Sequence, residues 1–267
     1  MAPETWWWRE RLDGAVLGFT QRGDGASIGP YRGLNLGRHV EDDEDRVDLN
    51  RAAVLDELAV LAGARSPSIR AVFMHQVHGS EVRLVSSARE SLSSDACDGI
   101  VTTQPHVALF SLVADCTPVL LHDLEAGVVA AVHAGRPGML AGVVPATVAV
   151  MRDLGSRRVA AVVGPSVCGR CYEVPEQMRD EAAAIEPVAA AVSWAGTASL
   201  DIATGVVEQL RREQVDVTWV PGCTKEDEQL YSYRRDGRTG RFGGVIMLTE
   251  PGSDRARDVD PVTETRE

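Results

Sequence analysis

A thiol and an imidazole lie at the ends of two apolar runs in the middle of the chain. Cys116 directly precedes the run at residues 118–122, and His133 directly follows the run at residues 128–132. Both runs have the length of buried strands, and the polar, glycine-containing segment between them is typical of a hairpin turn. Because an antiparallel hairpin brings its two outer ends together, we expect Cys116 and His133 to belong to one site.

Two more imidazoles, His75 and His78, follow a strand-like segment at residues 69–73. A cysteine thiolate and two neutral imidazoles form a suitable ligand set for zinc, and three protein ligands leave a fourth position open, as in catalytic zinc sites. The residue types alone do not choose between His75 and His78. They also leave a second interpretation, in which the cysteine and the histidines only pack against apolar neighbours.

The sequence around these residues resembles the bacterial laccase-domain family, also called polyphenol oxidases and interpreted as multi-substrate purine nucleoside phosphorylases. The resemblance covers about residues 14 to 249, and blocks in a common order are more specific than any single motif. The blocks are His75-Gln-Val-His78-Gly, Ala114-Asp-Cys116-Thr-Pro, Ala131-Val-His133-Ala-Gly, Gly33-Leu-Asn35-Leu-Gly, Val163-Gly-Pro165-Ser-Val, Cys171-Tyr-Glu-Val and Ser232-Tyr-Arg-Arg-Asp-Gly-Arg-Thr-Gly240-Arg.

The resemblance implies a zinc-dependent purine nucleoside phosphorylase that acts on adenosine, inosine and methylthioadenosine, and that also has adenosine deaminase activity. It implies that His78, Cys116 and His133 are the zinc ligands. Deamination needs an activated water and a nearby group that moves protons. Asp115 stands beside the ligand cysteine, so Cys116 and Asp115 are the candidate catalytic residues.

Phosphorolysis needs an anion pocket for phosphate, and guanidinium groups are suited to it. Arg234 lies in an arginine-rich segment and is a candidate for this contact, although such a segment is also typical of a solvated turn. Asn35 either holds a turn or contacts the substrate, and the resemblance favours contact.

The chain departs from the family after Gly135. Family members generally continue the His-Ala-Gly block with Trp-Arg-Gly, whereas here Arg136, Pro137 and Gly138 follow. Proline disfavours the α region for the preceding residue, so Arg136 is predicted to be extended, with a helix beginning behind it. Arg136 either reaches the family's anion or ribose position from this altered start or points into solvent.

Two other functions remain open. A copper-dependent, laccase-like polyphenol oxidase is compatible with one thiolate, two imidazoles and an axial methionine, for which Met74 or Met139 is available. Against it, the six histidines of the chain are too few and too scattered for additional copper centres. The other alternative is a Cys-His hydrolase in peptidoglycan editing, in which His133 activates Cys116 as the nucleophile.

The overall charge and the cysteine content limit the possible partners. A formal net charge of −12 argues against nucleic acid and anionic membrane surfaces as partners. No apolar run is long enough to span a membrane, and five irregularly spaced cysteines suit a reducing compartment, so we expect a cytoplasmic protein. Cys168-Gly-Arg-Cys171 is a C-x-x-C motif without a second pair, which favours neither a redox nor a metal role. The sequence does not determine the oligomeric state.

The hydrophobic periodicity predicts a mixed α/β sheet domain. Helices are expected at residues 45–62, 140–154, 176–185 and 199–214, with Pro145 either beginning or kinking the second. The α-β-β-α layer order of this mixed-sheet sandwich comes from the resemblance. We expect one catalytic domain over residues 1–249, onto which the Trp6–Trp8 segment is pinned unless it forms an interface, and a disordered tail at residues 250–267. The predicted strands are residues 16–19, 69–73, 82–85, 107–113, 118–122, 128–132, 159–163, 215–220 and 244–248.

Overall fold

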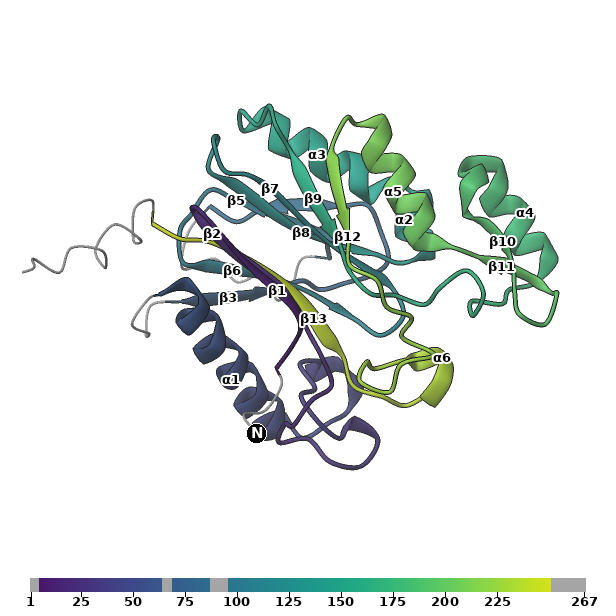
Figure 1. Cartoon of the computed structure of the whole chain (residues 1–267), viewed down its shortest axis with the longest axis horizontal. Coiled ribbons are helices and arrows are strands. Elements are labelled where there is room, and N and C mark those ends of the chain that lie inside the picture. The colour runs from purple at the N-terminus through teal and green to yellow at the C-terminus, as the bar shows by residue number, and fades with distance from the viewer. Residues whose placement is uncertain (1–4, 64–68, 87–95, 251–267) are drawn as a thin grey trace, which may run out of the picture.

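Two mixed β-sheets pack face to face in the computed structural model, which describes residues 5–63, 69–86 and 96–250 (Figure 1). Antiparallel pairing dominates both sheets, but the edge strands β3, β4 and β12 pair in parallel with their neighbours. The first sheet has the order β1 (Trp6–Leu12), β2 (Ala15–Thr20), β13 (Phe242–Leu248), β6 (Val107–Val113) and β3 (Arg70–Phe73). The second has the order β12 (Asp216–Trp219), β9 (Ala160–Val163), β7 (Thr117–Asp123), β8 (Val128–Ala134), β5 (Gly99–Thr102) and β4 (Val82–Leu84).

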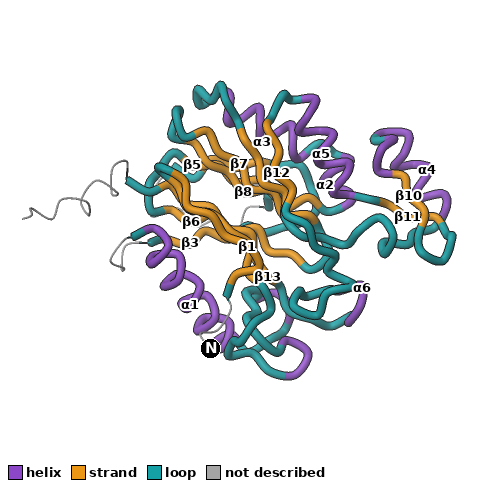
Figure 2. Tube along the Cα trace, in the orientation of Figure 1, coloured by secondary structure: helices purple, strands orange, loops and turns teal. Residues whose placement is uncertain are grey.

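Helices cover the outer face of each sheet, which gives the α-β-β-α order expected from the resemblance (Figure 1). One helix lies against the first sheet and three lie against the second, while α4 packs on the short β10–β11 hairpin at one end (Figure 2). The helices are α1 (Glu44–Ala62), α2 (Arg136–Leu140), α3 (Val143–Asp153), α4 (Glu176–Ile185), α5 (Ile202–Arg212) and α6 (Tyr233–Asp236), and the small hairpin is β10 (Ala190–Val192) with β11 (Ala198–Leu200). Three short 3-10 helices are η1 (Gly29–Tyr31), η2 (Arg38–Val40) and η3 (Pro187–Ala189).

The layers follow from the alternation of side chains along the buried strands. In β6, Leu109 faces the other sheet, while Phe110 faces α1. In β7, Leu120 faces the first sheet, while Val119 and Leu121 face the outer helices. Both sheets are therefore buried on two faces, which explains why their strands appear in the sequence as continuous apolar runs.

Helix α1 confirms the prediction for residues 45–62 to within one residue. The Asp43 carboxylate caps its first turn by accepting hydrogen bonds from the backbone N–H groups of Asp45 and Arg46. Gly63 ends the helix at φ +68°, a conformation that glycine adopts at little cost.

The N-terminal tryptophans lie in β1, a strand that the sequence pattern did not predict. Trp6 packs against the core next to α1, and Trp7 and Trp8 pack against the core between the sheets. The Trp7 indole also donates a hydrogen bond to the backbone oxygen of Pro221 at 3.1 Å. The segment is therefore pinned onto the domain, as expected.

The central hairpin is confirmed, but the conformation predicted for Arg136 is wrong. Strands β7 and β8 pair antiparallel, with Pro118 opposite His133. Arg136 is the first residue of α2 rather than an extended residue, because Gly135 takes the extended conformation one position earlier and Pro137 falls in the first helical turn. The predicted helix at residues 140–154 is split at Gly142, and Pro145 lies in the first turn of α3.

No helix among the described residues is both long and apolar enough to cross a membrane. Residues 251–267 of the expected tail lie outside the described part of the chain.

Candidate functional site

Three potential metal ligands meet where the two sheets are joined. His78 comes from the loop behind β3, Cys116 from the connection between β6 and β7, and His133 from β8. Nε2 of His78 lies 3.6 Å from Sγ of Cys116, and the two imidazole rings are 4.8 Å apart between centroids. One ligand atom from each residue lies within 4.8 Å of the others, so a single ion can contact all three. We call these residues the trio.

Asp98 positions both imidazoles of the trio. Its buried carboxylate contacts Nδ1 of His133 at 2.7 Å. The same carboxylate accepts hydrogen bonds from the backbone N–H groups of Val77, His78 and Gly79 at 2.7 to 3.2 Å. A carboxylate on the distal nitrogen of a ligand histidine fixes its tautomer and orientation, and here it leaves Nε2 of His133 free to bind an ion.

Two glycines allow the trio to approach so closely. A Cβ at residue 135 would lie 2.3 Å from Cδ2 of His78 and 3.2 Å from Sγ of Cys116. A Cβ at residue 138 would lie 2.8 Å from the backbone oxygen of Gly79. The backbone of Gly135 and Gly138 therefore packs directly against the His78 turn, and any larger residue would displace it.

The trio favours an ionised cysteine. Burial opposes ionisation of the Cys116 thiol, but the charge of His133 and hydrogen bonds from both imidazoles outweigh it and lower the pKa of Cys116. Burial also opposes a charge on His133, yet Cys116 and Asp98 outweigh it and raise the pKa of His133. Cysteine binds metals and attacks substrates as a thiolate, so the arrangement suits either use.

A cavity of about 460 Å³ opens beside the trio, within the size range of small-molecule sites. Its wall combines apolar side chains with the aromatic rings of Tyr172 and Tyr233. Three guanidinium groups, from Arg136, Arg234 and Arg241, also line it. The cavity therefore offers positive charge and aromatic surface to an anionic ligand with a ring system.

Arg136 is the least engaged of the three arginines. Arg234 donates to the backbone oxygen of Glu173 at 3.1 Å and lies over the ring of Tyr172, and Arg241 donates to the backbone oxygen of Thr239. Within the described residues, no hydrogen bond or ion pair engages the Arg136 guanidinium.

Asp115 lies in the cavity wall with its carboxylate already occupied. It accepts hydrogen bonds from Oγ1 of Thr224, Oγ of Ser232 and the backbone N–H of Arg234, each at 2.6 Å. Its φ of +93° lies in a region that non-glycine residues rarely adopt, so these bonds must offset backbone strain. The geometry supports a positioning role for Asp115 toward the loop that contains Arg234. The expected proton-transfer role stays a prediction.

Residues 16–249 match a family model described as multi-copper polyphenol oxidoreductase laccase. The chain belongs to this family. A Streptomyces coelicolor relative named as a purine nucleoside phosphorylase is 48% identical over 243 residues, which cover 90% of this chain and 98% of that protein. A Deinococcus radiodurans relative of the same name is 39% identical and covers 86% of this chain and 88% of its own length.

Solved structures share the fold of the chain. YlmD from Geobacillus stearothermophilus has a TM-score of 0.78 and 28% identity, covering 93% of this chain and 100% of that one. The hypothetical protein YfiH from Bacillus licheniformis has a TM-score of 0.79 and 27% identity, covering 88% and 93%. The family description names copper oxidation and the names of the relatives indicate phosphorolysis, so the site of this laccase-family chain must be interpreted from its own residues.

The structure brings most of the predicted site residues together, with Asn35 as the exception. Asn35 is fully buried and does not line the cavity. Its side-chain oxygen accepts from the backbone N–H groups of Gly37 and Arg241 at 3.0 and 2.8 Å. These contacts hold the turn and position the backbone of Arg241 in this laccase-family site. A contact between Asn35 and the substrate stays a prediction. His75 is exposed and also lies outside the cavity wall.

Sequence reasoning missed Asp98, Arg241 and Tyr172 in this family member. The short strand β5 begins directly after Asp98 and follows a polar stretch, so no periodic pattern marked the carboxylate as part of the sheet. Arg241 and Tyr172 stand within blocks that carried the family resemblance, and that proximity was the available signal.

Proposed function

We propose that the chain is a zinc-dependent purine nucleoside phosphorylase that acts on adenosine, inosine and methylthioadenosine and also deaminates adenosine. The main support is the cavity, which combines a metal-competent trio, three guanidinium groups and two tyrosines around a space suited to a nucleoside. The names of the curated relatives support the same reaction. On this proposal, the partners of the protein are purine nucleosides and phosphate, and the cytoplasmic location stays a prediction.

His78, Cys116 and His133 would hold the zinc ion. The donor set of two imidazoles and one thiolate fits zinc, and the absence of a side chain at Gly135 keeps the space beside the ligand atoms clear. A zinc ion at this position would supply Lewis acidity and lower the pKa of a water molecule, which deamination requires.

The arginines fit the demands of phosphorolysis. An oxygen of phosphate forms a bond to the anomeric carbon while the bond from that carbon to the purine nitrogen breaks, and the bonding electrons leave with the base. Arg136 and Arg234 would hold phosphate on one side of the anomeric carbon, so that attack becomes effectively intramolecular. Tyr172 and Tyr233 offer aromatic faces to the purine.

Incubation of the purified protein with adenosine, with and without phosphate and with and without a strong chelator, tests the proposal. Chromatography should identify adenine that depends on phosphate and inosine that does not. Chelation should abolish both products, and added zinc should restore them. Failure to form either product, or copper-dependent oxidation of phenols well above nucleoside turnover, would contradict it.

One observation supports a second candidate, the Cys-His hydrolase. The chain of contacts from Asp98 to His133 to Cys116 has the order of a catalytic triad. A hydrolase of this kind should cleave peptide or ester bonds after its metal is removed, whereas the proposed phosphorylase should lose its activity with the metal. Copper oxidation is less well supported, because Met74 and Met139 are packed in hydrophobic cores and neither lines the cavity.

A further inference from the structure

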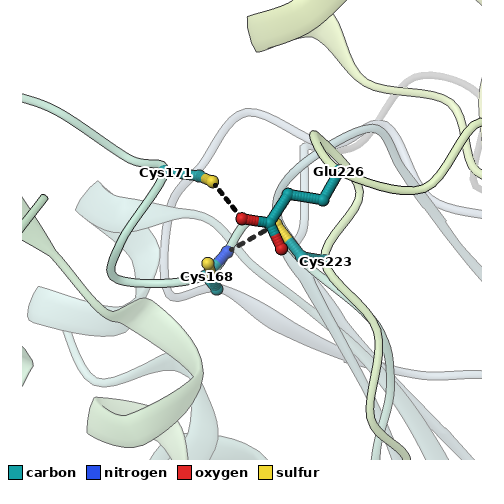
Figure 3. Close-up of side chains that lie close together, drawn as sticks. All are labelled: Cys168, Cys171, Cys223 and Glu226. Carbon is teal, nitrogen blue, oxygen red and sulfur yellow. Dashed lines mark hydrogen bonds between the residues drawn. The ribbon is translucent and has the colours of Figure 1, made fainter. Parts of the chain in front are cut away.

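Three thiols and a carboxylate gather at a second place, away from the trio (Figure 3). Two of the residues lie in the loop behind β9 and the other two in the loop behind β12. One ligand atom from each lies within 4.8 Å of the others, although the two loops are more than fifty residues apart in sequence. We call this group the loop cluster; its members are Cys168, Cys171, Cys223 and Glu226.

The backbone brings the two loops together. Ser166 and Cys223 form a β-bridge, with hydrogen bonds from the Ser166 N–H to the Gly222 oxygen and from the Thr224 N–H to the Ser166 oxygen. The backbone N–H of Cys171 donates to the oxygen of Cys168 at 2.9 Å, which closes a tight turn between the two cysteines. The three thiols therefore converge because the backbone of the first loop is hydrogen-bonded to that of the second and also forms a turn between Cys168 and Cys171.

Contacts inside the loop cluster match the surroundings of a metal ligand set. The backbone N–H of Cys168 donates to Sγ of Cys223 at 3.5 Å, and Sγ of Cys171 donates to Oε1 of Glu226 at 3.1 Å (Figure 3). The same carboxylate oxygen accepts from Nε1 of Trp194 at 3.0 Å. Hydrogen bonds to ligand sulfurs and carboxylates orient them in metal sites, so Trp194 acts here as an outer support.

Thiolate-rich sites select soft ions. Zinc–sulfur bonds of about 2.3 Å in a tetrahedron place sulfur atoms about 3.8 Å apart. The ligand atoms of the loop cluster all lie within 4.8 Å of one another, which is compatible with that spacing. Cys168, Cys171 and Cys223 are not in disulfides in the structure, and three thiols in one cluster cannot all be paired in disulfides with each other. An adjoining cavity of about 530 Å³, lined by Cys168, Cys223 and Glu226, gives an ion access from solvent.

We propose that the loop cluster is a second metal site, a structural zinc site with three thiolates and the Glu226 carboxylate as ligands. It fastens together two loops that lie beside the main cavity. The first loop continues into Tyr172, which lines that cavity. In the second, Thr224 donates to Asp115. The ion would thus hold the substrate cavity in shape without touching the substrate.

The metal content of the full-length chain tests this proposal. Elemental analysis should find two zinc ions per chain in the wild type and one in Cys116→Ala, which leaves the loop cluster unaltered. Cys223→Ser should also retain one ion, and its cobalt form should lose most of the thiolate-to-cobalt absorption, because the trio has a single thiolate. Cys97→Ala, which removes a buried cysteine outside both groups, should retain two.

Two results would overturn the second site. If the Cys116→Ala variant binds no zinc, the wild type binds metal at the trio alone. This result does not depend on whether Cys223→Ser folds. Fewer than five titratable thiols in denatured wild-type protein, isolated without reductant, would show that the cluster forms a disulfide instead. Neither outcome depends on the activity of the enzyme, so the phosphorylase proposal can fail or hold independently.

Discussion

At the scale of single residues, Asp98 joins parts of the site that are distant in sequence. Its carboxylate fixes the tautomer of His133 and the backbone turn that holds His78, and both Asp98 and His133 are buried. A substitution at Asp98 therefore affects two candidate metal ligands, His133 through its ring nitrogen and His78 through its backbone N–H.

We expect Asp98→Asn to weaken zinc binding by about 10- to 100-fold, because the amide cannot accept from both His133 and three backbone N–H groups as a carboxylate does. A competition titration against a chromophoric chelator measures the affinity. Asp123→Asn is the matched control, since Asp123 is another buried carboxylate that accepts backbone N–H groups, but far from the trio. Equal zinc affinity in Asp98→Asn and the wild type would remove this role from Asp98.

Arg136 is the cavity arginine with no partner among the described residues, so its charge is available to a ligand. We expect Arg136→Ala to reduce kcat/KM for phosphate about tenfold or more, which corresponds to about 1.4 kcal/mol of transition-state stabilisation. Steady-state kinetics with phosphate and nucleoside varied in turn measure the effect. Arg158→Ala, at an exposed site paired with Glu125, should leave the kinetics unchanged. Unaltered phosphate dependence in Arg136→Ala, with zinc retained, would favour the solvent-pointing alternative.

At the scale of elements, the sequence predicts what depends on local pattern. The pattern predicts a strand at residues 107–113, and they form β6 without any shift, because seven consecutive residues, six of them apolar, are buried on both faces. The sequence does not predict β1, where three charged residues follow the three tryptophans. Nor does it predict the place of Cys223 beside Cys168, which depends on how β9 and β12 pair. The same applies to the contact between Asp98 and His133. These features require knowledge of which strands are neighbours.

The side chain of Asp123 holds two loops at the end of β7, the turn between β7 and β8 and the segment before β9. Located at the end of β7, it accepts hydrogen bonds from the backbone N–H groups of Ala126, Arg157 and Arg158 at 2.7 to 3.1 Å. Asp123→Ala should lower the free energy of unfolding by about 1 to 3 kcal/mol, because it removes the partner of three partly buried backbone N–H groups. Chemical denaturation measures this change, and the exposed Glu125→Ala should change stability by less than about 0.5 kcal/mol.

The contribution of Asp123 should also depend on pH. Burial opposes its ionisation, but the backbone hydrogen bonds outweigh it and hold the pKa below the ordinary value of 3.8. The unfolded state therefore binds more protons in this range, and the stability that Asp123 supplies is present at neutral pH and lost as the pH falls below 3.8. The difference in unfolding free energy between the wild type and Asp123→Ala should shrink there. A constant difference down to pH 2 would contradict this account.

At the scale of the whole molecule, the trio lies where the two sheets are connected. His78 follows a strand of the first sheet, His133 belongs to the second, and Cys116 lies in the connection between them. An ion bound to all three therefore links the two halves of the sandwich. The proposed ion of the loop cluster would likewise join β9 and β12 at the edge of the second sheet.

Metal removal should therefore lower the thermal stability of the entire fold. A ligand that binds only the folded state stabilises it by about 4 kcal/mol when its free concentration is a thousand times its Kd. For a chain of this size, each kcal/mol shifts Tm by roughly 2 to 4 °C, so a strong chelator should lower the Tm of the wild type by about 10 °C or more.

Differential scanning calorimetry with zinc, with chelator and with magnesium in place of zinc measures the shift. Magnesium should not restore the Tm, because thiolate and imidazole ligands disfavour it. Cys116→Ala should show a smaller but non-zero response to chelation, since its loop cluster is intact. An unchanged Tm of the wild type after complete metal removal would mean that the sheets hold their arrangement without metal, and would separate the chemical role of the trio from any structural one.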